Sequence, residues 1–474
     1  MTPIQNSSRE NVHTPRKVIS MERRARRSPL ALAISVAVVV ALAGCAPGGG
    51  SSPGGAASNG PVSTNIASSG KVTLTVWDQN VDGGIAKAQK QLNSEFTRKY
   101  PNVTIKRVTR AFKDLKTTLK LALSSKTPPD VVQANQGYSD MGAFVKAGLI
   151  RNVDGFAKAY GWDSRYPSSL LDLNRFTSDG QTWHRGDLYG VSQTGELVGV
   201  FFNRSILNRL GISAPKTIAD LEAAMAKAES GGIKPISYGS VEKFPGIHLY
   251  GVLQNALAGK KAVRNLAFST GGKWTDSGSL KAAQTITDWV RKGYLDPSAS
   301  GISTDAAAAE FGKGDSAFYI SGTWQLDRLT SDLGDKAGFV ALNGAGSPDP
   351  ETMGGEGLAW AMTTGSKHPD VAGAYIDFIT NAHAAQVLVD TDNLPAVPPE
   401  GWSPKAGTLG ADIAAQWKSV NASDGLTPYL DYTTPTFYDT LSNGAQDLLT
   451  GQKTAQQFAD SLQADYTSFQ KSRG

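Results

Sequence analysis

The alternation of strand-like and helix-like segments constrains the fold of this chain more than any other feature of its sequence. Val72–Trp77 alternates apolar and polar residues as a half-buried strand does, and residues 85–100 then carry apolar side chains at helical spacing. The alternation continues with a strand-like run at 103–108, a helix-like run at 113–124 and a strand-like run at 130–133. Strands that alternate with helices are typical of a mostly parallel sheet with helical crossovers, so the sequence predicts an α/β fold.

Length and cysteine content predict two domains held together by burial alone. Further helices are expected at residues 218–230, 280–292, 369–380 and 454–469. The ordered part then amounts to about 400 residues, which exceeds what one hydrophobic core usually supports. Cys45 is the only cysteine among 474 residues, so no internal disulfide can form.

The N-terminal 44 residues have the pattern of an export signal. A cluster of arginines precedes the apolar run Leu30–Ala43, which spans 14 residues, whereas a membrane-spanning helix needs about 20. We therefore predict a signal peptide over residues 1–44, with Met21 as an alternative translation start. The competing interpretation is a short membrane anchor followed by an incidental cysteine.

The end of this signal resembles a bacterial lipobox. The sequence there is Leu42-Ala43-Gly44-Cys45. The resemblance implies that Cys45 becomes the lipidated N-terminus. It also implies that the mature chain is anchored to the outer face of the cytoplasmic membrane.

Composition separates the signal from the mature chain. Residues 1–44 contain seven of the 47 Lys and Arg and two of the 42 Asp and Glu, which leaves 40 of each in the remainder. The formal charge of +5 therefore reflects the signal, and no nucleic-acid partner is expected. Residues 45–70 are rich in Gly, Ser, Ala and Pro, which predicts a flexible tether.

The first candidate binding residues follow the predicted strands. Ligands of open α/β sheets lie outside the carboxyl ends of the strands, in the loops that begin there. That rule selects residues 77–80 and 134–137, from which we take Asp78, Gln79, Asn135 and Gln136 as the candidate hydrogen-bonding residues.

We expect no metal, no cofactor and no catalytic group. Asp78–Gly83 matches the first half of a calcium loop, but position twelve is Gln89, where a bidentate glutamate is required. The histidines lack metal-ligand spacing, and neither a phosphate loop nor a nucleophile elbow occurs.

Trp324 is the candidate aromatic platform. It follows a strand-like run and the pair Ser321-Gly322, so its indole is expected at a loop, where it can cover the apolar face of a sugar ring. Trp274 is a weaker candidate for the same role. For every tryptophan the alternative is ordinary core packing.

Four segments together resemble the family 1 extracellular solute-binding proteins, the maltose-binding-protein-like receptors of ABC sugar importers. They are residues 311–324, residues 189–203, residues 354–369 with 374–379, and residues 437–454. The resemblance extends from about Val72 to Phe469. It implies a two-lobed periplasmic-binding-protein fold of the type II kind, with the lobes joined by crossover hinge segments.

The resemblance also implies lobe boundaries and further site residues. The N-terminal lobe would comprise residues 71–178 and 340–390, and the C-terminal lobe residues 179–339 and 391–474. Trp324 would stack on sugar, and the additional ligand-binding residues would be Glu196, Gly354, Gly355, Glu356 and Tyr438. The loop 133–138 departs from the maltose receptor, which puts maltodextrin specificity in doubt.

The sequence therefore predicts a monomeric receptor without enzymatic activity that captures a sugar or oligosaccharide and delivers it to an ABC transporter permease. One alternative is an exported carbohydrate-active enzyme, which needs a pair of carboxylates across the cleft. The other alternative is a receptor for a charged solute such as a glycerol phosphate. That function needs Arg or Lys at the pocket, and the selected loops contain neither.

The lipobox generates the first testable prediction. Replacing Cys45 by alanine removes the thiol that carries the lipid, so an uncleaved precursor or a form released from the membrane should accumulate. Membrane fractionation followed by mass spectrometry of the mature N-terminus checks this. An unlipidated wild-type N-terminus at any residue other than Cys45 would contradict the prediction.

Overall fold

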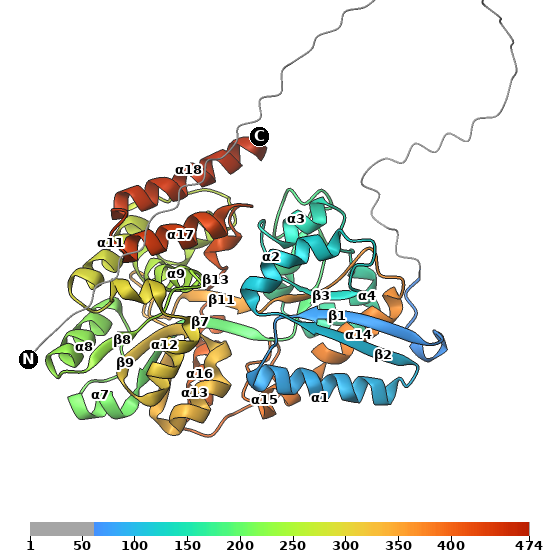
Figure 1. The fold of residues 1–474 in the computed structure, drawn as a ribbon, viewed down its shortest axis with the longest axis horizontal. Coiled ribbons are helices and arrows are strands. Elements are labelled where there is room, and N and C mark those ends of the chain that lie inside the picture. Colours follow the sequence, from blue (N-terminus) through green and yellow to red (C-terminus); the bar gives the residue numbers. More distant parts are fainter. Residues whose placement is uncertain (1–60, 474) are drawn as a thin grey trace, which may run out of the picture. The chain divides into compact units, whose positions relative to one another are not determined.

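The computed structural model of this chain describes residues 61–473, in which two sheets are surrounded by helices. The predicted signal peptide, Cys45 and residues 45–60 of the predicted tether lie outside the described residues. Figure 1 shows α1–α4 and α14 around the first sheet, and α8, α9, α11 and α12 around the second. The prediction of an α/β fold with two lobes is confirmed.

The first sheet has five strands in the order β2-β1-β3-β12-β6. The strand β1 is parallel to both β2 and β3, whereas β12 is antiparallel to β3 and β6. Every second residue of β1 is buried, and all of β3 is buried, as the patterns of their sequences require. The strands are β1 (Val72–Asp78), β2 (Val103–Thr109), β3 (Val131–Ala134), β6 (Val191–Ser192) and β12 (Ala359–Met362).

The second sheet has six strands, organised around the long strand β7. The order is β13-β11-β7-β9-β8, and β10 also pairs with β7. The strand β7 is antiparallel to β9, β10 and β11. The strands are β7 (Gly195–Asn203), β8 (Lys234–Ser237), β9 (Ser316–Gly322), β10 (Ala337–Val340), β11 (Thr352–Glu356) and β13 (Leu426–Thr427); a separate pair is formed by β4 (Arg175–Phe176) and β5 (Asp187–Leu188).

The predicted helices form close to their expected positions, and several begin at the capping residues expected of helix N-termini. Thr217 and Asp220 form a reciprocal capping box at the start of α8, and Asp276 accepts a backbone hydrogen bond at the start of α11. The α-helices are α1 (Gly83–Lys99), α2 (Phe112–Leu123), α3 (Met141–Lys146), α4 (Asp154–Tyr160), α5 (Trp162–Arg165), α6 (Ser168–Leu171), α7 (Arg204–Leu210), α8 (Ile218–Ser230), α9 (Pro245–Ala258), α10 (Lys260–Ala267), α11 (Ser277–Arg291), α12 (Thr304–Lys313), α13 (Leu326–Leu333), α14 (Pro369–Thr380), α15 (Ala382–Asp390), α16 (Leu409–Ala422), α17 (Phe437–Leu449) and α18 (Ala455–Arg473). The short 3₁₀ helices are η1 (Ile66–Ser68), η2 (Asp172–Asn174), η3 (Pro297–Gly301), η4 (Thr323–Gln325), η5 (Gly334–Lys336) and η6 (Leu430–Tyr432).

The chain passes between the two sheets at points that differ from the predicted boundaries. The predicted crossings at Asp179 and Val340 are wrong, because strand pairing assigns these regions differently. Asp179 precedes β6, which still belongs to the first sheet, and Val340 ends β10, which pairs with β7 of the second sheet. The first two passages therefore lie between β6 and β7 and between β11 and β12.

The third passage lies between α15 and α16. The helix α15 packs on α1 of the first lobe, whereas α16 packs on β10 of the second lobe. The predicted crossing at Thr391 falls inside this interval.

The three passages are hydrogen-bonded to one another. The backbone N–H of Gly195 donates to the carbonyl of Leu394 at 2.9 Å, and the N–H of Ala396 donates to Gln193 at 3.1 Å. On the other side, the N–H of Gly357 donates to the carbonyl of Thr194 at 3.0 Å. The segment that connects β6 to β7 is therefore the central strand of a three-segment hinge.

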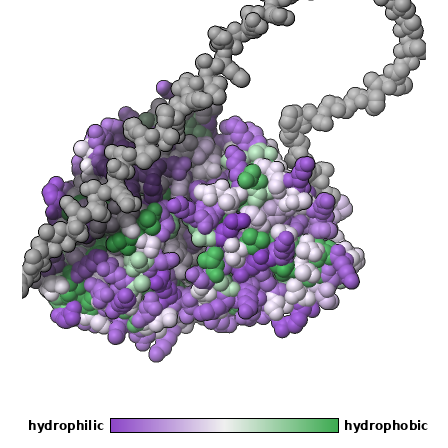
Figure 2. Space-filling model, in the orientation of Figure 1, coloured by the Kyte–Doolittle hydropathy of each residue, from purple (hydrophilic) through white to green (hydrophobic). Residues whose placement is uncertain are grey.

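Large aromatic side chains fill the interiors of both lobes. Trp162 and Trp360 are fully buried in the first lobe, and Trp274 and Trp289 are fully buried in the second. The prediction of Trp274 as a ligand platform is wrong, since its indole packs in the core with its ring centroid 4.6 Å from that of Phe437. Figure 2 shows that the visible face of the molecule is mostly hydrophilic. No helix among residues 61–473 has both the length and the apolar character needed to cross a bilayer.

The predicted tether ends earlier than Gly70. Ile66 is only 1% exposed and lies in η1, and its carbonyl accepts a hydrogen bond from the side chain of Asn102 at 3.0 Å. The backbone N–H of Ser63 also donates to Asp370 on α14. The prediction of a flexible segment is thus wrong for residues 62–70, because one apolar side chain in a polar stretch suffices to hold that stretch against the first lobe.

Replacing Ile66 by alanine tests this attachment. The substitution should lower the free energy of unfolding by about 2 to 4 kcal/mol, because it empties a buried site. Thr64→Ala, at an exposed neighbouring position, serves as the control and should change it by less than about 0.5 kcal/mol. Denaturant titration measures both values. Equal stabilities of the two variants would show that Ile66 does not hold this segment, and would favour the original prediction of a flexible tether.

Candidate functional site

A cavity of about 710 Å³ is lined by loops of the first sheet, by the hinge and by the second lobe. The first lobe contributes residues 79–85 and 111–113 together with Gln133 and Asn135, and the hinge contributes residues 194–196 with Asn393 and Leu394. The second lobe contributes residues from α9, η4 and α13 together with Tyr429, Asp431, Tyr432 and Tyr438. Its size lies within the range of ordinary small-molecule sites, about 300–1,000 Å³.

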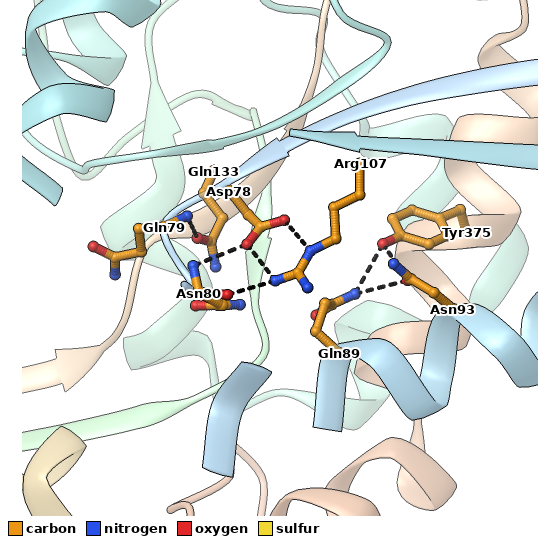
Figure 3. A network of polar contacts seen from close by, with 8 residues as sticks. All are labelled: Asp78, Gln79, Asn80, Gln89, Asn93, Arg107, Gln133 and Tyr375. Atoms are coloured by element: carbon orange, nitrogen blue, oxygen red, sulfur yellow. Dashed lines mark hydrogen bonds and ion pairs between the residues drawn. The ribbon is translucent and has the colours of Figure 1, made fainter. Parts of the chain in front are cut away.

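A buried ion pair holds the loop that follows β1 (Figure 3). Arg107 on β2 donates from Nε to Oδ2 of Asp78 and from Nη2 to Oδ1, both at 2.7 Å. The same Nη2 donates to the carbonyl of Asn80 at 2.7 Å, and the N–H of Asn80 donates to Asp78 at 2.9 Å. The N–H of Gln79 donates to Oε1 of Gln133 on β3 at 2.9 Å. The backbone of residues 78–80 is therefore fixed at both sides.

This arrangement changes the predicted role of Asp78. Its side chain is fully buried, forms an ion pair with Arg107 and does not line the cavity. Asp78 was predicted to bind ligand, but in the structure its carboxylate is paired with Arg107, a partner that the sequence did not reveal. Gln79 does line the cavity as predicted, and so does Asn80, whose buried Nδ2 has no hydrogen-bond partner.

A second polar network in Figure 3 explains Gln89. Its Nε2 donates to the hydroxyl of Tyr375 on α14 at 2.8 Å and to Asn93 at 3.0 Å. The residue that departs from the calcium-loop pattern therefore anchors α1 to α14. Within residues 61–473 no group of three or more His, Cys, Asp or Glu side chains is arranged to hold a metal ion.

The loop after β3 carries two amide side chains, of which Asn135 lies at the cavity and Gln136 at the hinge. Asn135 lines the cavity, and its Oδ1 accepts a hydrogen bond from the hydroxyl of Tyr432 at 3.0 Å. Gln136 does not line the cavity. Its Nε2 donates to the carbonyl of Gly357 at 2.9 Å, and its Oε1 accepts from Tyr432. Gln136 was predicted to bind ligand and is instead engaged in tying the hinge to η6.

Trp324 presents its indole to the cavity from η4. The side chain is 39% exposed, and its ring covers Gly322, where a β-carbon would approach the ring to 1.9 Å. The ring centroid of His248 on α9 lies 5.1 Å away. Burial lowers the pKa of His248 to about 3, so its imidazole is neutral at physiological pH.

The aromatic lining continues to the first lobe. Tyr438 lines the cavity as predicted, with its ring 6.4 Å from that of Phe112 on α2. Phe112 also contacts Phe244 of the second lobe edge to face at 5.9 Å. Lys116 lies 4.5 Å above the ring of Tyr438 and is ion-paired with Asp140.

Two carboxyl groups line the cavity, Glu196 half-buried and Asp431 buried. Glu196 on β7 accepts a hydrogen bond from the hydroxyl of Tyr429 at 2.7 Å, and burial raises its pKa to about 7. Burial likewise raises the pKa of Asp431 to about 6, although Lys116 opposes that shift. The charged residues that line the cavity are the acids Asp82, Glu196, Glu242, Asp305, Asp327, Asp332 and Asp431 and the bases Lys113 and Arg328.

The predicted ligand-binding group at β11 lies behind the cavity. Gly354 and Gly355 pair with Leu197 and Glu196 of β7, and a β-carbon on Gly354 would approach the carbonyl oxygen of Glu196 to 2.1 Å. Glu356 is buried, accepts a hydrogen bond from Asn174 at 2.6 Å, and has its pKa raised to about 8 by burial. None of the three predicted residues lines the cavity, because close pairing with β7 leaves them no access to it.

Sequence reasoning missed most of the aromatic lining. The missed lining residues come from segments that carry no motif; they are Phe112, His248, Tyr429 and Tyr432. The only signal in the sequence is that Tyr429 and Tyr432 lie on either side of Asp431. Asn80 lay within the loop selected by the strand-end rule, so attention to every polar residue of that loop would have found it.

Comparisons with known proteins agree with this architecture. The sequence profile of a family described as bacterial extracellular solute-binding protein matches residues 50–386. A multiple sugar-binding protein of Streptococcus mutans is 23% identical over 337 residues, which are 69% of this chain and 75% of that protein. A probable sugar-binding periplasmic protein of Mesorhizobium japonicum is 24% identical over 221 residues, 44% of this chain and 47% of that protein.

Solved structures share the fold over most of the chain. A chitin oligosaccharide binding protein has a TM-score of 0.72 at 22% identity, covering 85% of this chain and 99% of its own. The solute-binding protein RafE, solved in complex with raffinose, has a TM-score of 0.67 at 18% identity, covering 84% of this chain and all of its own. These likenesses confirm the predicted two-lobed fold.

Replacing Arg107 by methionine tests the support of the cavity loop. The variant leaves the carboxylate of Asp78 buried without its cation, so the free energy of unfolding should fall by about 3 to 5 kcal/mol. Adding Asp78→Asn should recover part of the loss, and Lys106→Met on an exposed neighbour should cost less than about 0.5 kcal/mol. Denaturant titration of the four proteins checks the series, and an Arg107→Met variant as stable as Lys106→Met would contradict it.

Proposed function

The chain belongs to the family of bacterial extracellular solute-binding proteins, and we propose that it is a sugar or oligosaccharide receptor of an ABC transporter. The observation that carries this proposal is Trp324. All nine tryptophans lie among the described residues, and Trp324 is the one that has a large exposed fraction. An indole held open in a cavity offers a flat apolar surface, which matches the apolar face of a sugar ring.

The polar lining supplies what stacking cannot. Sugar hydroxyls lose hydrogen bonds to water on binding, and each loss has to be replaced by protein groups. Gln79 and Asn135 present amides, Asn80 presents an unpartnered N–H donor, and Glu196 presents a carboxyl group. The names of the relatives and the ligands of the solved structures, which include sugars and oligosaccharides, support the same ligand class.

We further propose that the receptor is anchored and delivers its ligand. Cys45 would carry the lipid on the outer face of the cytoplasmic membrane, and residues between it and Val62 would form the tether. A monomer with the sugar between its lobes would dock on the permease subunits, since closure around a ligand selects a conformation that a transporter can distinguish.

A receptor for an anionic solute is a weaker proposal. Lys113 and Arg328 line the cavity, although both come from segments outside the loops selected from the sequence. Arg328, however, lies 3.5 Å from Asp305 and 3.6 Å from Asp332, so its charge is already shared. Acids outnumber these two bases in the lining, which disfavours a phosphate.

An enzyme is also a weaker proposal. Glycoside hydrolysis needs one protonated and one ionised carboxyl group flanking the bond. Burial raises the pKa of both Glu196 and Asp431, whereas an acid and base pair is usually marked by environments that move the two pKa values apart. Prolonged incubation with the bound sugar should therefore leave the sugar intact by chromatography.

Removing the Trp324 indole tests the proposed function. Trp324→Ala should weaken binding of the sugar returned by a thermal-shift screen by about 5- to 150-fold, corresponding to ~1 to 3 kcal/mol of lost stacking. Its effect on stability should be smaller than that of Trp274→Ala, which empties a core site and should cost about 3 to 5 kcal/mol.

Calorimetric titration and denaturant melts of both variants give the two readouts. Unchanged affinity together with a large loss of stability in Trp324→Ala would identify the indole as a packing residue and remove the proposal.

A further inference from the structure

We propose that the recognised sugar carries a protonated amine, and that Glu196 is the carboxylate that pairs with it. This inference rests on the proposed function and narrows the ligand from sugars in general to amino sugars. Four of the residues that line the cavity, Trp324, His248, Tyr429 and Glu196, form what we call its inner lining. They combine aromatic faces with a carboxyl group.

The inner lining is suited to an ammonium group. The rings of Trp324, His248 and Tyr429 follow one another, with His248 5.1 Å from Trp324 and 6.1 Å from Tyr429. Glu196 is hydrogen-bonded to the last of these rings at 2.7 Å. Aromatic faces beside a carboxylate attract a cation both through the ring quadrupoles and through the opposite charge.

No protein cation neutralises Glu196 within the described part of the chain. Its side-chain hydrogen-bond partner is the neutral hydroxyl of Tyr429, and it forms no ion pair with a described residue. The cations that line the cavity are Lys113 and Arg328, and Arg328 is paired with Asp305 and Asp332. Lys116, which lies above the ring of Tyr438, is ion-paired with Asp140. A ligand ammonium group could therefore form a charge-assisted hydrogen bond with Glu196 without displacing a protein cation.

The other charged groups of the lining favour the same ligand charge. Asp305 and Asp332 are paired with Arg328, and Asp327 with Lys87. Glu242 and Asp431 form no ion pair with a described residue, which leaves an excess of negative charge. Negative potential in a concave site raises the local concentration of cations and lowers that of anions. A second, independent observation marks a ligand position between the lobes: Nδ2 of Asn80 is buried in the lining without a partner.

Binding of an amine should release protons. Burial raises the pKa of Glu196 to about 7, so the free receptor is partly protonated at neutral pH, and an ammonium partner would lower that pKa. The titratable groups that interact with its charge are Glu356 on β11, Tyr429, and Tyr432 at η6. His248 on α9 and Asp431 at η6 line the same cavity. Among these, Asp431, with a pKa raised to about 6, is the one that adds to the effect below pH 7.

The sign of the pH dependence follows. Lowering the pH protonates Glu196 and removes the charge that the ammonium group requires. The amine of an amino sugar is already protonated at pH 6, so below that pH the protonation of Glu196 alone sets the trend. Affinity for an amino sugar should therefore fall about eightfold from pH 6 to pH 5, whereas affinity for a neutral sugar should not fall in this way.

The experiment uses matched pairs of sugars in which one member has an amine where the other has a hydroxyl at carbon 2 of each ring. The glucosamine trimer and cellotriose form one such pair, and the corresponding amino and neutral forms of galactose and mannose form others. The amine member should bind about 10- to 100-fold more tightly than its hydroxyl partner. Calorimetry at pH 6, where the sugar amine is protonated before it binds, in two buffers of different ionisation enthalpy should show about 0.8 of a proton released per amine bound.

Glu196→Gln provides the matched variant, since it keeps the shape and removes the charge. It should abolish the preference for the amine and the proton release, while Glu229→Gln, on the exposed face of α8, should keep both. A thermal melt of each variant confirms folding.

The outcomes separate the two proposals. A neutral sugar that binds as tightly as its amine partner overturns this inference and leaves the sugar receptor standing. Amine preference that survives in Glu196→Gln overturns the role of Glu196. If no member of any pair binds, the proposed function and this inference are both overturned.

Discussion

The hydrogen-bonded contact among the three crossover segments is the constraint on which the rest of the structure depends. Residues 193–195 connect the two sheets and receive backbone hydrogen bonds from Ala396 and Gly357 on opposite sides, while Gly195 donates to Leu394. Because each segment satisfies its neighbours' polar groups, the lobes are joined by a small sheet and not by independent linkers. Glu196 comes directly after this hinge, so the carboxyl group of the cavity is positioned by the connection itself.

A second constraint is the ion pair between Asp78 and Arg107 in the first lobe, which shapes one side of the cavity. Asp78 is fully buried, and Arg107 meets it with paired hydrogen bonds at 2.7 Å. Such a pair contributes little net stability but is costly to break, so it fixes one geometry. That geometry directs Gln79 and Asn80 to the cavity. Asp78, which was predicted to bind ligand, thus positions the loop whose next two residues line the cavity.

The second lobe shapes the same cavity by close approach of backbone and ring. Gly322 lets the Trp324 indole lie flat over β9, and Gly354 lets β11 approach β7. Glycine at these positions was visible in the sequence, but its purpose was not, because a missing side chain gains meaning only when the neighbour that occupies the space is known. Gly354 and Gly355 were therefore assigned to the ligand when they serve strand pairing.

The sequence by itself determined the α/β class, the positions of most helices and the exposed Trp324, because periodicity and loop composition are local properties. It also determined that Gln79 and Asn135 lie at the cavity, since both follow strands of one parallel sheet. Only the tertiary structure decided that Asp78 meets Arg107, that β6 and β10 belong to the first and second sheets, and that His248 and Tyr429 surround Trp324. These depend on which distant segments pair, and strand pairing and side-chain partners are set by contacts across the chain that no local pattern encodes.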